Sequence, residues 1–204
     1  MKELIIIGIG GHGKVIADIA YSNGYKVVLF LDDIKKSFDN HQVVGTIKDI
    51  DKFNSDNYEF IVAIGKNKIR KIIQKELITK GFNITTLIHP SVVISPSVKI
   101  GKGTVVMANC VINAGTLIGE GCIINTASTI DHDCIVHDFV HISPGVHIAG
   151  TVEIRERTWI GIGSSIKNNI KICEDCIFGA GSVVIKDIFN SGTYVGVPVK
   201  KVKG

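Results

Sequence analysis

Two different patterns of hydrophobic residues meet near residue 90 of the chain. Before that point, short β-branched runs that end in Gly or Asp alternate with stretches of helical spacing. The runs predict buried strands at 4–10, 26–33, 59–65 and 83–89, and the other stretches predict helices at 12–23 and 67–80. Strands that alternate with helices indicate βαβ units, so we expect a small parallel sheet, one half of a doubly wound α/β fold.

A period of six residues dominates the second part of the chain. Every sixth position from Ile94 to Val184 is apolar, and fifteen of these sixteen residues are Ile or Val. Four residues after each of them stands a small or β-branched residue, and this second column holds Cys110, Cys122, Cys134 and Cys176. The period predicts hexapeptide repeats of a parallel β-helix, in which each repeat forms one flat side of a three-sided coil. These four cysteines are then expected to be buried packing groups.

Stacking of the coils makes residues eighteen apart in sequence neighbours in space, about 4.8 Å from each other. No long insertion interrupts the repeats, so any active site is expected to use outward-facing side chains and neighbouring chains. The two patterns predict an α/β domain at 1–89, a Rossmann-like half of a doubly wound fold. An all-β parallel β-helix with a short C-terminal tail is predicted at 90–204.

Composition removes several classes of function. The net charge is +4 and the basic residues are scattered along the chain, a pattern that does not favour nucleic-acid binding. No run approaches the roughly 18 apolar residues that a membrane span needs, and the first apolar run is interpreted as a strand rather than a signal peptide. The five cysteines are an odd number, so we expect neither a disulfide framework nor a zinc site, and a reducing cytoplasm fits best.

Histidines gather between residues 131 and 150, outside both inward columns, and are His132, His137, His141 and His147. A metal site is disfavoured, because His132 and His141 are nine residues apart and fall on different sides of the coil. Ordinary surface histidines are one interpretation. The sharper one makes His132 a general base, because flanking Asp131 or Asp133 could fix its tautomer; which of the two does so is left open. Gly150 lies one coil above and is a candidate oxyanion donor.

Several motifs together resemble a known family. They are GIGGHGKVIAD (8–18), FLDD (30–33), AIGKNKIR (63–70), HPSVVISPSVKIGKG (89–103), DHDCIVHDFVHISPGVHIAG (131–150) and GVPVKKV (196–202). The chain resembles left-handed β-helix sugar acetyltransferases with an N-terminal Rossmann-like domain. That family includes UDP-4-amino-sugar N-acetyltransferases of bacillosamine synthesis, GDP-perosamine N-acetyltransferases and sialic acid O-acetyltransferases.

The resemblance implies homotrimers with active sites between adjacent β-helices, acetyl-CoA as co-substrate and no metal. It places the catalytic histidine on His132 and its carboxylate partner on Asp133, with His141 near the acetyl group or the substrate. It assigns coenzyme A contacts to His141, Gly150, Ile162 and Ala180. It assigns nucleotide-sugar contacts to Gly10, Gly11, His12, Asp32, Asp33, Gly65 and Lys66. Two departures from the family pattern are Val199 in the closing GVPVK and Lys66, where Asn is frequent; the second bears on which nucleotide sugar fits.

The expected function is acetyl-CoA-dependent N-acetylation of a nucleotide-activated amino sugar for bacterial surface glycans, with a UDP-4-amino-4,6-dideoxy sugar as the leading substrate. O-acetylation of a sialic or related nonulosonic acid is the first alternative, and a non-catalytic scaffold or sugar-nucleotide sensor is the second. Gly8, Gly10 and Gly13 also satisfy GxGxxG, but the half-sized sheet disfavours NAD chemistry. The sequence leaves open the sugar, the nucleotide and the atom that is acetylated.

Overall fold

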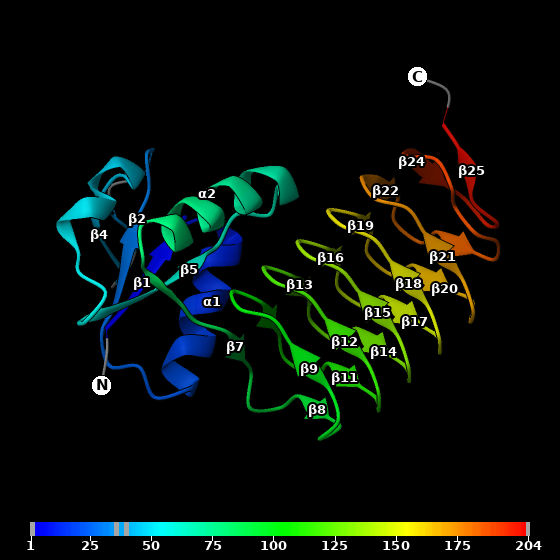
Figure 1. Cartoon of the computed structure of the whole chain (residues 1–204), viewed down its shortest axis with the longest axis horizontal. Coiled ribbons are helices and arrows are strands. Elements are labelled where there is room, and N and C mark those ends of the chain that lie inside the picture. The colour runs from blue at the N-terminus through cyan, green and yellow to red at the C-terminus, as the bar shows by residue number, and fades with distance from the viewer. Residues whose placement is uncertain (1–2, 35–36, 39–40, 203–204) are drawn as a thin grey trace. The chain divides into compact units, whose positions relative to one another are not determined.

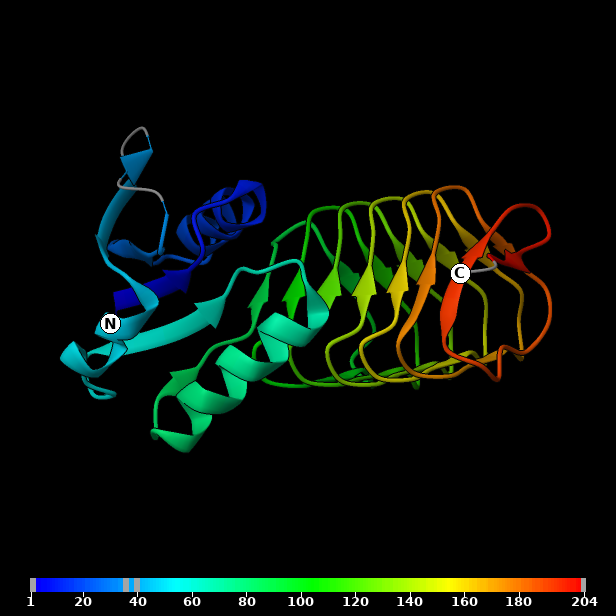
Figure 2. The same ribbon diagram turned by 90° about the horizontal axis from the view of Figure 1, so that it is seen from above.

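The computed structural model describes residues 3–34, 37–38 and 41–202. It divides into two compact units, Met1–Pro90 and Ser91–Gly204 (Figures 1 and 2). The first is an α/β unit and the second is a stack of short parallel strands. The predicted fold class is therefore confirmed in both parts.

The N-terminal unit is built on a sheet with the strand order β3-β4-β2-β1-β5-β6, in which β2, β1, β5 and β6 are parallel to their neighbours. Its elements are β1 (Glu3–Ile7), α1 (Gly11–Ser22), β2 (Val28–Leu31), β3 (Ser37–Phe38), β4 (His41–Gly45), the 3-10 helix η1 (Ile47–Lys52), β5 (Tyr58–Val62), α2 (Asn67–Thr79), β6 (Asn83–Ile84) and β7 (Leu87–Ile88). Both predicted helices are present within one residue of their expected bounds. The predicted strand at 83–89 forms two short strands, and the segment β3-β4-η1 was not predicted.

Apolar residues from alternate positions of β1 and β5 form the core on one face of this sheet. Ile5, Ile7, Phe60 and Val62 are fully or almost fully buried and pack against Leu77 of α2. Burial on both faces explains why these strands are nearly continuous apolar runs. Within the described ranges, neither helix is long and apolar enough to span a membrane.

Three parallel sheets form the sides of the β-helix in the second unit (Figure 2). The first contains β10 (Val105–Val106), β13 (Ile123–Ile124), β16 (His141–Ile142), β19 (Trp159–Ile160), β22 (Cys176–Phe178), β24 (Gly192–Val195) and the antiparallel β25 (Lys200–Lys201). The second contains β8 (Val93–Ile94), β11 (Val111–Ile112), β14 (Thr129–Ile130), β17 (His147–Ile148), β20 (Ser165–Ile166) and β23 (Val183–Val184). The third contains β9 (Lys99–Ile100), β12 (Leu117–Ile118), β15 (Ile135–Val136), β18 (Glu153–Ile154) and β21 (Lys171–Ile172).

The coils stack in the register that the repeats predict. Val105 pairs with Ile123, and Ile123 with His141, so each step along a sheet is eighteen residues. The large column is buried from Val106 to Val184, and the small column is buried from Thr104 to Ser182. Its hydroxyls satisfy the main chain inside the coil: Thr116 Oγ1, for example, donates to the Asp131 carbonyl at 2.8 Å.

The corners use a conformation that the sequence pattern did not reveal. Every sixth residue from Gly103 to Gly181 has a positive φ, and eight of these fourteen residues are not glycine. The left-handed conformation is unfavourable for residues with a side chain, so the stacked neighbours must maintain it. One such corner residue is Asp133, with φ 56°. Its main-chain N–H donates to the Ala114 carbonyl one coil below, at 2.9 Å.

The cysteines are reduced, and four of the five are buried as expected. The expectation overlooked one feature, because Cys173 and Cys176 do have C-x-x-C spacing. Their Sγ atoms lie 3.4 Å apart, and burial together with the neighbouring Cys173 thiol raises the pKa of Cys176 to about 12. No group of three or more His, Cys, Asp or Glu residues suited to a metal ion occurs among the described residues.

Replacing Ile154 with Ala is expected to lower the free energy of unfolding by about 2–5 kcal/mol, because the buried side chain leaves a cavity inside the stacked coils. The measurement is urea unfolding followed by circular dichroism. Leu117→Ala, which truncates an outward residue of the same sheet, is the matched control and should cost clearly less. Equal losses in the two variants would contradict the inward assignment of the large column.

Candidate active site

His132 lies at the corner that joins β14 to β15. Its imidazole is 57% exposed, and Nδ1 lies 2.8 Å from Oδ2 of Asp133. Asp133 itself has the left-handed corner conformation, with φ 56°. The hydrogen bond to Asp133, followed by the charges of Asp131 and Asp133, raises the pKa of His132 above its ordinary value. The arrangement leaves Nε2 as the nitrogen that can exchange a proton with a substrate.

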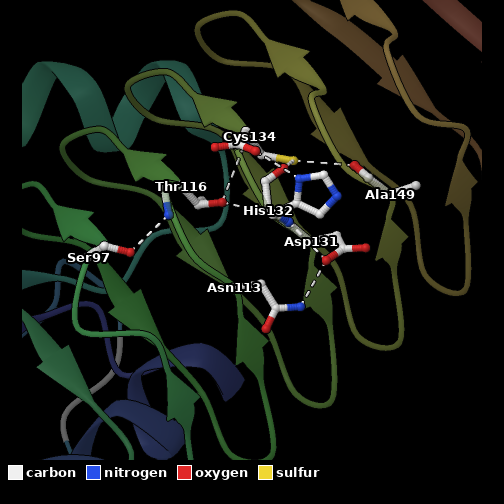
Figure 3. Close-up of polar contacts among 9 residues, drawn as sticks. Ser97, Asn113, Thr116, Asp131, His132, Cys134 and Ala149 are labelled. Carbon is white, nitrogen blue, oxygen red and sulfur yellow. Dashed lines mark hydrogen bonds and ion pairs between the residues drawn. The ribbon is translucent and has the colours of Figure 1, made fainter.

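Asp131 contacts the same histidine at a different place. Its Oδ1 accepts the main-chain N–H of His132 at 2.9 Å and the side-chain amide N–H of Asn113 at 2.9 Å (Figure 3). Hydrogen bonds from Asn113 and from the His132 main chain lower the pKa of Asp131, so it is a carboxylate at neutral pH. Asp133 therefore contacts the ring, and Asp131 contacts the main chain.

Two glycines make room for the side chains at this corner. A Cβ atom at Gly150 would lie 2.6 Å from both Cε1 and Nε2 of His132, and one at Gly115 would lie 2.4 Å from Oδ1 of Asp133. The Gly150 main chain thus lies directly against the reactive side of the imidazole. Position 150 requires glycine for this close approach, because the gap that a Cβ would occupy is filled by the ring.

A second feature is a groove of about 400 Å³ on the sheet that contains β16 and β19. It is lined by Asn125, His141, Ser143, Pro144, Trp159, Gly161, Ile162, Ile177, Phe178 and Ala180. The rings of His141 and Trp159 stack with centroids 5.4 Å apart and an angle of 3° between planes, and Trp159 Nε1 donates to Ser143 Oγ at 2.8 Å. Asn125 Nδ2 lies 3.5 Å from His141 Nε2. The groove is largely apolar, with a few polar groups at one end.

The structure therefore divides the candidate residues of the β-helix into two sets. His132, Asp133 and Gly150 lie together at one corner, while His141, Ile162 and Ala180 lie together in the groove. Gly150 was grouped with the coenzyme A contacts on the resemblance, but its neighbour is the His132 ring. Within one chain, the corner residues do not line the groove. The remaining histidines have partners of their own: Glu153 for His137, at 3.1 Å, and Thr129 for His147, at 2.9 Å.

In the N-terminal unit, the candidate residues follow three neighbouring parallel strands, β2, β1 and β5. Carboxyl ends of parallel strands share one sheet edge, so the turns after these strands lie together. The Asp32 carboxylate links two of them by accepting the Ile9 main-chain N–H at 2.9 Å, and Asp33 accepts that of Ile47 at 3.0 Å. Gly10 and Gly11 begin α1, Gly65 precedes α2, and a Cβ at any of the three would meet open space. The free start of α1 suits a phosphate group.

His12 and Arg70 occupy the interior of the same sheet edge. Burial, assisted by the charge of Arg70, lowers the pKa of His12 to about 4, so this histidine is neutral. Arg70 is 1% exposed and donates from Nη1 to the Ile64 carbonyl at 2.8 Å and to the Gly65 carbonyl at 3.1 Å. It therefore fixes the turn in which Gly65 and Lys66 lie.

A hexapeptide β-helix with an outward histidine–carboxylate pair, preceded by a nucleotide-binding type of α/β unit, defines the class of hexapeptide acyltransferases. Residues 3–77 match the PglD N-terminal domain model, and residues 151–186 match the model of the bacterial transferase hexapeptide (six repeats). The acetyltransferase domain of PglB from Neisseria gonorrhoeae is 40% identical over 99% of this chain and 100% of that chain, with a TM-score of 0.97. A second structure of that domain is in complex with acetyl coenzyme A.

PerB from Caulobacter crescentus, solved in complex with CoA and GDP-perosamine, is 35% identical over 100% of this chain and 98% of that chain, with a TM-score of 0.95. UDP-N-acetylbacillosamine N-acetyltransferase of Bacillus subtilis (strain 168) is 37% identical over 53% of this chain, and the match spans 52% of that enzyme, about half its length. The chain belongs to the hexapeptide-repeat acetyltransferase family with a PglD-type N-terminal domain. The predicted resemblance is confirmed.

Proposed function

We propose that the protein is an acetyl-CoA-dependent N-acetyltransferase that acts on a nucleotide-activated amino sugar. The observation that carries this proposal is the exposed imidazole of His132, with Nδ1 bonded to Asp133 and Nε2 against the main chain of Gly150. This arrangement supports general base catalysis, since the carboxylate fixes one nitrogen as donor and leaves the other to accept a proton. The family and its relatives favour acetyl transfer among the reactions that such a base can serve.

The proposed reaction is a direct transfer. The sugar nitrogen attacks the thioester carbonyl while Nε2 of His132 removes one of its protons, and the Gly150 N–H is assigned to the oxyanion of the tetrahedral intermediate. When the C–S bond breaks, the sulfur leaves with its electron pair and receives the proton from His132. The products are the acetamido sugar and free coenzyme A. No step of this reaction uses a protein thiol, and Cys134, the cysteine nearest in sequence to His132, is buried.

The groove at His141 and Trp159 is assigned to acetyl-CoA. Assembly into a homotrimer would bring the His132 corner of one chain next to the groove of another. In this arrangement His132 of one protomer faces the groove of its neighbour. Apolar walls at Ile162, Ile177 and Ala180 suit the pantetheine arm, and the polar end at Asn125 and His141 suits the thioester. Each active site is then completed only by a second copy of the chain.

Filling the groove tests this assignment. Ala180→Phe is expected to raise KM for acetyl-CoA about tenfold, equivalent to about 1.4 kcal/mol, while KM for the sugar changes little. Ile135→Phe enlarges an outward residue on another sheet and is the control. Unchanged acetyl-CoA kinetics in Ala180→Phe would place the coenzyme elsewhere.

The N-terminal unit is assigned to the nucleotide. The start of α1 at Gly10 and Gly11 would take the phosphates, and the turns at Asp33 and Lys66 would contact the remainder of the nucleotide sugar. Among nucleotide sugars, a UDP-4-amino-4,6-dideoxy sugar for bacterial surface glycans is the leading candidate, and GDP-perosamine is the second because of the PerB relative. Lys66, which stands where Asn is frequent in the family, is the residue expected to influence which of these nucleotide sugars fits.

The test is a panel of UDP-, GDP- and CMP-linked amino sugars with acetyl-CoA, in which release of free thiol is followed. We expect turnover with one 4-amino sugar far above that with the others. A protein that neither turns over any member nor binds acetyl-CoA in a thermal-shift assay would instead be a scaffold or sensor.

A further inference from the structure

One carboxylate oxygen of Asp131 accepts two hydrogen bonds at the corner that holds His132. Oδ1 accepts from the His132 main chain and from the Asn113 side chain, each at 2.9 Å. The bond from Asn113 comes from the coil below and holds the carboxylate in place (Figure 3). Asp131 thus lies next to the candidate base without bonding to its ring.

The same local bond occurs at another corner without a charge. Six residues earlier, Oδ1 of Asn125 accepts the main-chain N–H of Thr126 at 2.8 Å. Asn113, eighteen residues before Asp131, is also an amide at the equivalent repeat position. A neutral amide oxygen is therefore enough to form this bond, and the turn does not require the negative charge of Asp131. The charge must have another role.

We infer that Asp131 is a positioning residue whose hydrogen bond fixes the His132 main chain and whose negative charge strengthens His132 as a base. The inference rests on the proposed function only for its catalytic consequence. It differs from the role of Asp133, which bonds directly to Nδ1 and sets the tautomer of the ring.

The charged surroundings of His132 within the chain are simple. Its own corner contributes Asp131 and Asp133, and both charges raise the pKa of His132. The coil below contributes the neutral Asn113 and Gly115, and the coil above contributes the main chain of Ala149, Gly150 and Thr151. The nearby Cys134 thiol is buried, and the charges of Asp131 and Asp133 contribute to its raised pKa, so it is neutral. Asp131 is therefore the charge that can be removed while the ring keeps its hydrogen bond.

A negative charge beside the imidazole stabilises its protonated form and raises its pKa, which makes the neutral ring a stronger proton acceptor. Removing the charge should lower the pKa, so the neutral ring persists to lower pH but accepts the substrate proton less readily. We therefore expect the pKa of His132 to be lower in the variant than in wild type.

The experiment compares Asp131→Asn with wild type in two measurements on the full chain. Asn can keep the acceptor oxygen and loses only the charge, as at Asn125. An NMR titration of the His132 ring, which needs no turnover, is expected to give a lower pKa in the variant. The pH profile of kcat/KM should shift downward by the same amount, and kcat on its high-pH plateau should fall severalfold while KM for acetyl-CoA is unchanged. Asp138→Asn removes a carboxylate at another corner, where Oδ1 accepts the Glu120 N–H at 2.8 Å, and is the matched control.

An unchanged His132 pKa in Asp131→Asn would overturn the inference, whatever the activity. A loss of activity at every pH without a pKa change would reduce Asp131 to a structural group and would overturn it as well. Failure of the proposed function is recognised separately, since the NMR shift would then appear without any acetyl transfer to amino sugars.

Discussion

Replacing His132 with Ala is expected to lower kcat by roughly 10²–10⁴-fold, the usual contribution of a positioned general base. The imidazole is the group whose Nε2 can take the amine proton, and the neighbouring Asp133 has its oxygen bonded to the other nitrogen. KM for acetyl-CoA should change little, because the apolar walls assigned to the pantetheine arm, Ile162, Ile177 and Ala180, are unchanged. The measurement is steady-state thiol release with the preferred amino sugar.

His137→Ala is the control for this variant. His137 is also a histidine of the β-helix, and its Nε2 lies 3.1 Å from Oε1 of Glu153. Its replacement should leave kcat within a few-fold of wild type. Near-normal turnover in His132→Ala would remove His132 from the mechanism.

Gly150→Ala is expected to lower kcat by about 10²-fold, because displacement of a catalytic group by about 1 Å can cost that much. The new Cβ would lie 2.6 Å from Nε2 of His132, so the ring must move. Gly150 does not have a left-handed φ, and alanine therefore introduces no backbone strain. The melting temperature should stay close to that of wild type.

A double-mutant cycle separates the two explanations of this loss. If Gly150→Ala acts through the position of the imidazole, adding it to His132→Ala should cost little further activity. Additive losses would mean that position 150 acts independently of the ring, for example through the oxyanion alone. The comparison uses the same kcat assay as the single variants.

The architecture of the β-helix was predictable because its physical cause repeats in the sequence. Each side of a coil must place one large aliphatic residue and one small residue inward. These two residue types therefore recur every six residues, and three sides give the eighteen-residue register. The corners left no such signal. Their left-handed positions are occupied by residues as different as Asn109, Phe139 and Arg157, because stacked neighbours impose the conformation. The segment from β3 to η1 was missed because its runs are too short to show a period.

For the candidate site, the eighteen-residue register predicted which residues are neighbours but not where their side chains point. Counting by eighteen placed Gly150 against His132, and the close approach in the structure agrees with that count. Side-chain direction could not be counted, so the sequence left the roles of Asp131 and Asp133 open. Arg70 was not identified as a site residue, although it is buried and bonds to the turn that contains Gly65. The stack of His141 on Trp159 requires two outward positions eighteen residues apart and no motif marks it.

The most direct test of N-acetylation is the chemical identity of the acetylated product. Wild-type protein would be incubated with acetyl-CoA and an equal mixture of a UDP-4-amino sugar, its amino-free analogue and a nonulosonic acid, and the products would be analysed by mass spectrometry before and after treatment with hydroxylamine. N-acetylation predicts an amino-sugar nucleotide that gains one acetyl group and keeps it through the treatment, because an amide resists hydroxylamine. An acetyl group that hydroxylamine removes, formed on an amino-free or nonulosonic acceptor in preference to the amino sugar, would contradict N-acetylation.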